Sequence, residues 1–254
     1  MKYLSVEEAI DAPGMRLVLT AGVPGPWGEA AKSMFAYKGI EYTAVFQEGA
    51  GENEALLRWT GQTSAPVAVY EDLPPACHWF DLLMLAERIA PAKPLVPVNS
   101  AERVDVLGLS ALIAGMDGFG WHRRLQLLAP MMQMDEPPQA IARMARKYGW
   151  SEQAHTAATS RLQAISAELD SRLAQQQARG RDYFVGDAVS AADFYWANMA
   201  GLIKPLGHED NPMPDYMRDT YESSDADTRA CLTPRLEAHR DRMYQRHIAL
   251  PLVF

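Results

Sequence analysis

A proline at the start of an apolar run constrains the fold of this chain more than any other residue. Pro66 comes directly before Val67–Tyr70 (VAVY). Because proline lacks an N–H and has a fixed φ, a strand accepts it only at its first residue, at an edge or at a bulge. An X–Pro bond can also be cis, and a cis bond can serve a binding site. We therefore expect a strand to open at Pro66, beside a functional surface.

The residues around this proline predict a compact α/β domain. An apolar run at residues 15–20 indicates a buried strand, and the breaker-rich AGVPGPWG after it indicates a loop. A helix from Glu29 to a stop at Gly39, an alternating strand at 40–46 and a helix around NEALLRWTG follow. APVAVYED and a short strand near PACHW then predict a hairpin, before a helix that runs to Pro91. The predicted order is βαβαββα over residues 15–91, after an N-terminal extension at 1–14.

The rest of the chain has a different pattern. Residues 92–100 contain two prolines, and we interpret them as a linker. Beyond them the apolar residues keep helical spacing, and no convincing strand occurs. We therefore expect residues 101–254 to form an all-α bundle domain.

Composition narrows the possible partners. The formal net charge is −8, and a nucleic-acid or anionic-membrane partner would require a basic patch instead. The two cysteines, Cys77 and Cys231, are too few for a disulfide framework, which indicates a reducing compartment. The first residues lack the apolar segment of a signal peptide, and no uninterrupted apolar run approaches the ~20 residues that span a bilayer. We expect a cytoplasmic protein.

A helix start late in the chain has a recognisable sequence. In FVGDAVSAADFYWANMAGLI, Ser190 and Asp193 have the S-x-x-D spacing of an N-terminal capping box. We interpret the pair as structural. His208 and Asp210 lack metal-ligand spacing and a partner elsewhere, and we expect no metal site.

Taken in order, these fragments resemble the glutathione transferase superfamily. The similarity covers about residues 15–200 and rests on AYKGIEY, the APVAV strand opening, LAERIAP and GDAVSAADFYWA. It implies a thioredoxin-like N-terminal domain, a helical second domain, a homodimer, and glutathione as co-substrate. It also implies that Pro66 is cis and that the main chain of Ala65 pairs with the cysteinyl part of glutathione.

The resemblance further implies that a group near the start of the first family helix activates the glutathione thiol. An anion is favoured at a helix N-terminus, and the thiolate is the nucleophile. The usual tyrosine, serine or cysteine positions fall here on Ala21, Gly25 and Trp27, none of which has a suitable hydroxyl or thiol. Two candidates stay open: the hydroxyl of Thr20, and backbone N–H groups from Trp27 onward.

Other site residues follow from the same resemblance. The acidic residue and serine that hold the γ-glutamyl carboxylate are replaced by Cys77 and His78, and Gln62 and Ser64 are further candidate contacts with glutathione. A pocket for the acceptor substrate is expected in the glycine-interrupted segment MDGFGWHRR. Its expected lining residues are Met116, Phe119, Trp121 and His122.

The sequence leaves three functions open. The leading hypothesis is a glutathione transferase-like enzyme that promotes thiolate attack on a small apolar electrophile, or a glutathione-dependent isomerisation or reduction. The alternative is a non-catalytic binding or assembly protein that has lost the thiol-activating residue. A redox protein that uses Cys77 is the third, and it requires a thiol of low pKa.

Overall fold

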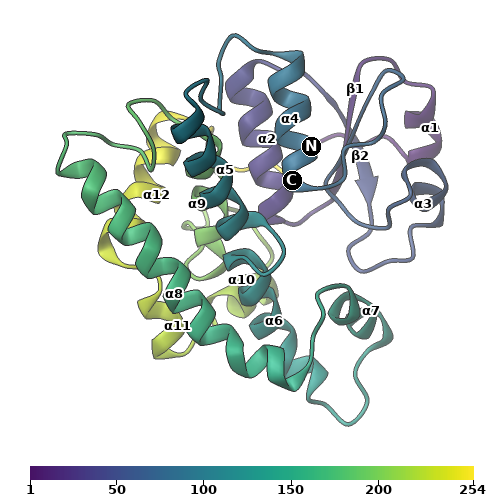
Figure 1. The fold of residues 1–254 in the computed structure, drawn as a ribbon. Helices are drawn as coiled ribbons and strands as arrows, with labels where there is room; N and C mark the ends of the chain where they lie inside the picture. Colours follow the sequence, from purple (N-terminus) through teal and green to yellow (C-terminus); the bar gives the residue numbers. More distant parts are fainter.

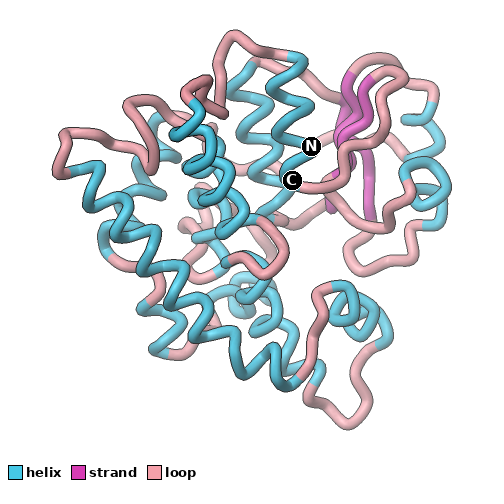
Figure 2. The backbone as a smooth tube through the Cα atoms, in the orientation of Figure 1, coloured by secondary structure: helices cyan, strands magenta, loops and turns pink.

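A three-stranded sheet forms the N-terminal part of the protein, described here from a computed structural model of residues 1–254. Its strands are β1 (Met15–Thr20), β2 (Thr43–Gln47) and β3 (Val67–Tyr70), in the order β2-β1-β3. β1 pairs in parallel with β2 and antiparallel with β3. Figure 2 shows these strands side by side in magenta, with helices on both sides.

Two pairs of helices cover the two faces of this sheet. α2 (Pro26–Lys38) and α4 (Trp79–Ile89) lie on one side, and α1 (Val6–Ile10) and α3 (Glu54–Thr60) lie on the other (Figure 1). The β1 side chains alternate between the two faces: Leu17 packs with Phe35 of α2, and Val18 packs with Leu56 of α3. The α2 helix ends at the predicted Gly39, whose φ of 73° suits glycine.

Residues 1–14, the predicted N-terminal extension, pack on the sheet, because Leu4 forms a parallel bridge with Val45 and α1 packs against β2 and α3. This bridge protects the free edge of β2. The predicted fourth strand is reduced to one bridge, in which Ala68 and Ala76 exchange two hydrogen bonds of 2.9 Å. Two prolines, Pro74 and Pro75, precede Ala76 and cannot donate to a longer ladder.

The remainder of the chain is helical, as predicted. Its elements, in order, are α5 (Ser100–Ala114), α6 (Phe119–Met132), α7 (Gln139–Lys147), α8 (Glu152–Gln177), α9 (Ala191–Met199), the 3₁₀ turn η1 (Ala200–Leu202), α10 (Asp215–Glu222), α11 (Ala226–Ala230) and α12 (Pro234–Arg246).

The stretch Ser100–Met132 has the length and apolar content of a membrane-crossing helix, although half of its apolar window is buried inside the protein. It is also divided into α5 and α6 by a turn at residues 115–118. Core burial therefore accounts for its apolar character.

The two parts of the chain share one hydrophobic core. The largest cluster includes Met34 of α2 and Leu83 of α4 together with residues of α5, α6, α8, α9 and α12. The predicted linker joins it, because Leu95 is fully buried and its carbonyl accepts a hydrogen bond from Ala191 N–H. The domain limits at 15–91 and 101–254 stay a prediction, since this core crosses them.

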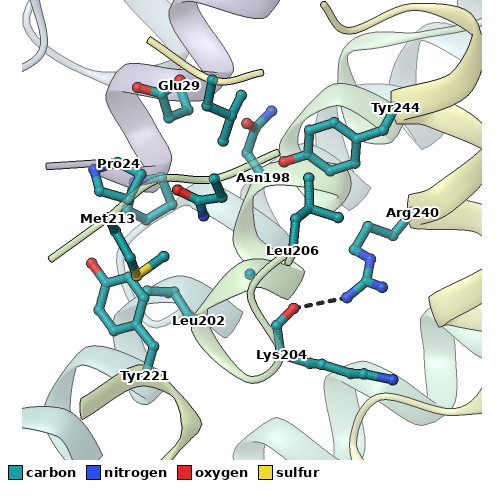
Figure 3. A pocket seen from close by; sticks show the side chains of 14 residues that line it. Pro24, Glu29, Asn198, Leu202, Lys204, Leu206, Met213, Tyr221, Arg240 and Tyr244 are labelled. Atoms are coloured by element: carbon teal, nitrogen blue, oxygen red, sulfur yellow. Dashed lines mark hydrogen bonds between the residues drawn. The ribbon is translucent and has the colours of Figure 1, made fainter. Parts of the chain in front are cut away.

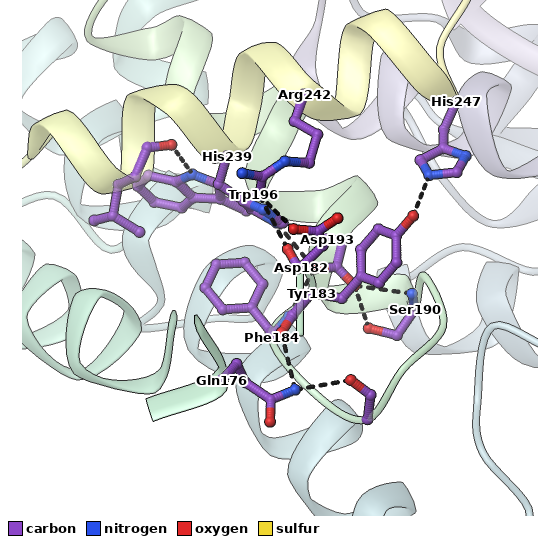
Figure 4. A network of polar contacts seen from close by, with 12 residues as sticks. Gln176, Asp182, Tyr183, Phe184, Ser190, Asp193, Trp196, His239, Arg242 and His247 are labelled. Carbon is purple, nitrogen blue, oxygen red and sulfur yellow. Dashed lines mark hydrogen bonds and ion pairs between the residues drawn. The ribbon is translucent and has the colours of Figure 1, made fainter. Parts of the chain in front are cut away.

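Helix α9 lies at the centre of this core. All nine of its residues are buried, and it packs against α2, α5 and α12. Its N-terminus is held by the carboxylate of Asp193, which accepts hydrogen bonds from Ser190 N–H (2.8 Å), Ser190 Oγ (2.7 Å) and Phe184 N–H (3.0 Å). His239 of α12 lies 2.9 Å from the same carboxylate (Figure 4). Asp193 thus joins α9, the preceding loop and α12.

We predict that Asp193→Ala lowers the free energy of unfolding by about 3–5 kcal/mol, because it leaves several buried donors without an acceptor. The measurement is chemical denaturation. The matched control is Asp187→Ala, which removes an exposed ion pair with Arg181 and should cost less than about 1 kcal/mol. Equal losses in the two variants would contradict the central role of Asp193.

Candidate functional site

A cleft of about 790 Å³ lies between the sheet and the helical part of the chain. One wall is formed by the end of β1, the start of α2 and the loops at residues 47–52 and 63–65. The opposite wall comes from α6, α7 and α10, and Phe254 also lines the cleft. Such a cleft is large enough for a small-molecule ligand.

The start of α2 presents free hydrogen-bond donors to this cleft. The backbone N–H groups of Trp27 and Gly28 have no backbone acceptor, as expected in the first turn of a helix. The Trp27 indole is already used, because its Nε1 donates to the Ala114 carbonyl at 2.8 Å. Trp27 therefore offers the cleft its main chain and not its ring nitrogen, and an anion at this place would meet the positive end of the helix dipole.

Thr20 also lines the cleft, but its hydroxyl hydrogen is already used. Thr20 Oγ1 donates to Gln47 Oε1 at 2.6 Å. The Gln47 amide cannot turn to accept from another group, because its Nε2 donates to the carbonyls of Glu48 and Thr63. Of the two candidates left open by the sequence, the backbone N–H groups are the ones free to hydrogen-bond an anion.

The segment before Pro66 forms the facing edge of the cleft. The Ala65–Pro66 peptide bond is cis, and neither the N–H nor the carbonyl of Ala65 has a backbone partner. Ala65 and Ser64 both line the cleft, and Ser64 Oγ accepts a hydrogen bond from Lys147 of α7. Gln62 lies two residues further back and does not line the cleft.

Helix α7 brings positive charge across the cleft. Arg143 donates from Nη2 to the Ala50 carbonyl at 3.1 Å, and its Nη1 lies 3.5 Å from Glu52. Burial lowers the pKa of the second cation of α7, Lys147.

The one acidic group at the start of α2, Glu29, is buried, and burial raises its pKa although Lys32 opposes that shift. Glu29 is paired with Lys32 at 2.8 Å, so it offers little repulsion to an anionic ligand.

Cys77 and His78 do not line the cleft. Cys77 packs beside Ala65 on the other sheet face, and burial together with Asp81 raises the pKa of its thiol. A raised pKa disfavours the thiolate, so the redox hypothesis for Cys77 is not supported. His78 is exposed at the N-terminus of α4 and caps it without a side-chain hydrogen bond.

The four residues expected to line an acceptor pocket lie elsewhere. Met116 is 80% exposed in the α5–α6 turn, and Phe119 is fully buried against Trp196. His122 lies 2.8 Å from Asp117 in the same turn. Trp121 packs at a tilted angle against Tyr148 and donates to its carbonyl, one layer behind the cleft. The sequence predicted a helix here correctly, but none of the four expected residues lines the cleft. The α6 residue that does so is Arg124.

Sequence reasoning also missed the aromatic and basic residues from α7 and α10. Lys147, Tyr148, Tyr216 and Tyr221 line the cleft although they lie far from β1 in the sequence. No local motif marks them. The amphipathic pattern of α7 indicates a helix with one apolar face, and only the packing shows that this helix reaches Ser64.

A second cavity lies behind the start of α2 and is shown in Figure 3. Its volume is about 20 Å³, which is room for one water molecule and no substrate. Arg240 lines it and donates to the Lys204 carbonyl at 2.8 Å. No group of three or more His, Cys, Asp and Glu side chains is arranged to hold a metal ion.

We predict that Gly120→Ala destabilises the protein by about 1–3 kcal/mol through overpacking. A Cβ at Gly120 would lie 2.6 Å from Met199 Sδ and 3.1 Å from Trp27 Cζ2, which presses on the start of α2. Gly108→Ala is the matched control, because nothing lies within 4 Å of its added Cβ. The control should be neutral or stabilising, and thermal unfolding of both variants measures the difference. A stable Gly120→Ala protein would show that α2 yields at this contact.

Comparison with solved structures identifies the fold. A glutathione S-transferase from Methylobacterium radiotolerans, solved with glutathione sulfonate, has a TM-score of 0.64 at 18% identity, over 94% of this chain and 97% of that one. A glutathione transferase family member from Pseudomonas fluorescens, with two glutathione bound, has a TM-score of 0.63 at 14% identity, over 97% and 98%. Rice GST1 in complex with glutathione has a TM-score of 0.60 at 16% identity, over 95% and 93%.

No protein-family model and no curated protein matches the chain. The chain therefore has the glutathione transferase fold, a thioredoxin-like domain followed by a helical domain, at a large distance in sequence.

Proposed function

We propose that the protein binds glutathione in the cleft and activates its thiol as a transferase. One observation supports this most: the unpaired N–H and carbonyl of Ala65 and the free N–H groups of Trp27 and Gly28 line the same cleft. The first set suits the main chain of a peptide, and the second suits an anion. Glutathione contains both, as a peptide with a thiolate-forming cysteine.

In this proposal the thiolate lies at the start of α2. The N–H groups of Trp27 and Gly28 donate to the sulfur, and the helix dipole lowers the pKa of the bound thiol. Glu29 does not cancel this effect because it is paired with Lys32. Lys147 and Arg143 line the same cleft and attract the carboxylates of glutathione.

The reaction proposed is attack by the thiolate on an electrophilic carbon. In a substitution an S–C bond forms and the leaving group departs with its electron pair; in an addition the carbon skeleton accepts a proton instead. Apolar side chains that line the cleft receive the acceptor. They are Ile141, Met144, Met217 and Phe254.

A non-catalytic binding protein is the second candidate function. It is favoured by the hydrogen bond that engages Thr20 and by the replacement of the γ-glutamyl contacts by Cys77 and His78. It differs from the enzyme in one measurable property, the ionisation of the bound thiol.

The two cysteines are free, which agrees with the cytoplasmic location expected from the sequence.

We predict that glutathione binds, and that its bound thiol has a pKa below its value in solution. Calorimetric titration with glutathione and S-methylglutathione measures binding, and thiolate absorbance against pH measures the pKa. Thr20→Val should leave that pKa within about half a unit, or about 0.7 kcal/mol, because backbone donors hold the sulfur. A larger rise of the thiol pKa in the variant would show that the Thr20 hydroxyl donates to the sulfur.

Two other outcomes distinguish the candidate functions. Binding with an unshifted thiol pKa would favour the non-catalytic protein. Failure of both ligands at millimolar concentration would remove glutathione from the proposal altogether.

We also propose a homodimer, as the fold similarity implies. Three apolar side chains, Phe80, Val98 and Val104, are exposed by 42%, 92% and 70% around α4 and the start of α5. We predict that the protein sediments as a dimer and that Phe80→Glu with Val104→Glu shifts it to monomer, because each charge would be buried in the interface. Met116→Glu in the exposed α5–α6 turn is the control. A monomeric wild-type protein would contradict the proposal.

A further inference from the structure

Two consecutive arginines on α6 have opposite surroundings. Arg123 is buried, and its guanidinium donates to the carbonyls of Leu202, Tyr221 and Ser223 and to the side chains of Gln126 and Ser224. These hydrogen bonds tie α6 to η1 and α10, so Arg123 is structural. Arg124 instead lines the cleft, where its buried Nε has no hydrogen-bond partner.

Arg124 is partly buried and forms no ion pair with an Asp or Glu side chain. Its charged neighbours of opposite sign are absent, and its hydrogen-bonding neighbours are the phenol groups of Tyr221 and Tyr148. Phenol groups can accept from a guanidinium, yet they supply no negative charge at neutral pH. A cation in an enclosed site without a counter-ion is costly unless a ligand completes it.

The geometry of the side chain suits one class of ligand. A guanidinium presents Nε–H and Nη–H in a planar fork that matches the two oxygens of a carboxylate. The neighbouring Tyr148 keeps its hydroxyl hydrogen as a donor, because burial raises its pKa although Arg124 opposes that shift. Tyr221, which lines the same cleft, carries a second hydroxyl beside the guanidinium.

This group lies close to the proposed sulfur position. The Tyr148 ring is 6.1 Å from the Trp27 ring, centroid to centroid, and Trp27 begins the helix turn that would hold the thiolate. Tyr148 also packs at a tilted angle against Trp121, whose Nε1 donates to the Tyr148 carbonyl and holds this residue in position. Arg124 and the start of α2 line the same cleft, so one ligand can contact both.

We propose that Arg124, with Tyr148 and Tyr221, binds a carboxylate of the acceptor substrate, so that the electrophile is an apolar molecule that carries a carboxylate. This inference rests on the proposed function for the sulfur position, but the anion site itself does not require glutathione. The sequence predicted an apolar electrophile, and the proposal adds that this electrophile carries a negative charge.

The test compares matched ligands that differ only in charge. The first pair is S-carboxypropylglutathione and its uncharged amide, and the second pair, without glutathione, is phenylbutanoate and its amide. Calorimetry should show that the wild-type protein binds each carboxylate at least about tenfold more tightly than its amide. Arg124→Met should reduce this preference to less than about twofold, and Arg124→Lys, which keeps the charge but loses the fork, should leave an intermediate preference.

Arg179→Met is the control, since Arg179 is exposed and forms no ion pair at the end of α8. This variant should keep the full preference for the carboxylate over the amide. Lys147→Met tests another cation of the cleft and should keep most of that preference. Circular dichroism and thermal unfolding establish that each variant is folded.

The outcomes separate the two proposals. Equal affinity for carboxylate and amide in the wild-type protein, an unchanged preference in Arg124→Met, or its loss only in Lys147→Met would overturn the assignment to Arg124. If neither glutathione derivative binds but phenylbutanoate is preferred over its amide, the anion site stands and the glutathione function fails. If the two glutathione derivatives bind with equal affinity and phenylbutanoate binds no more tightly than its amide, the glutathione function stands and the anion site fails.

Discussion

The buried carboxylate of Asp193 is the interaction on which the rest of the structure depends. It accepts from the backbone N–H groups of Phe184 and Ser190, which precede α9, and lies against His239 of α12, so one side chain joins α9, the preceding loop and α12. A buried charge is tolerated only when such partners surround it. Because α9 packs directly on α2, this network also sets the position of the helix whose first turn faces the cleft.

The donors at that first turn belong to the main chain. The N–H groups of Trp27 and Gly28 and the peptide groups of Ala65 are available whatever side chains occupy these positions. This explains how the cleft can keep the geometry of a peptide and anion site although Ala21, Gly25 and Trp27 provide no hydroxyl. In the proposed function these main-chain groups would replace a catalytic side chain, and the packing of Trp27 against Gly120 would keep them in position.

Charge within the cleft is distributed unevenly between its walls. Glu29 on the sheet side is paired with Lys32, and Glu52 is paired with Arg143 of α7, whereas Arg124 and Lys147 line the cleft without an acidic partner. A protein with a net charge of −8 therefore has two cations without acidic partners in this cleft. Overall charge reports on solubility and on large partners, and it does not describe the local charge of a cleft.

The sequence predicted the fold correctly because its local patterns have direct physical causes. The strand at residues 15–20, the stop at Gly39 and the S-x-x-D spacing at Ser190 each follow from burial, backbone freedom or capping. The length of the fourth strand and the pairing of Leu4 could not be predicted, since whether Ala76 or Leu4 pairs with a strand depends on a distant neighbour.

The candidate site divides in the same way. On the sheet side, local signals marked Pro66 and the loop after Thr20 in the sequence, and the family resemblance assigned them to a binding site. The side chains that line the opposite wall follow from helix packing, which no local pattern shows. Consecutive residues on a helix point in different directions, so the packing of α6 surrounds Arg123 with hydrogen-bond acceptors and leaves the Nε of Arg124 without one beside Tyr148.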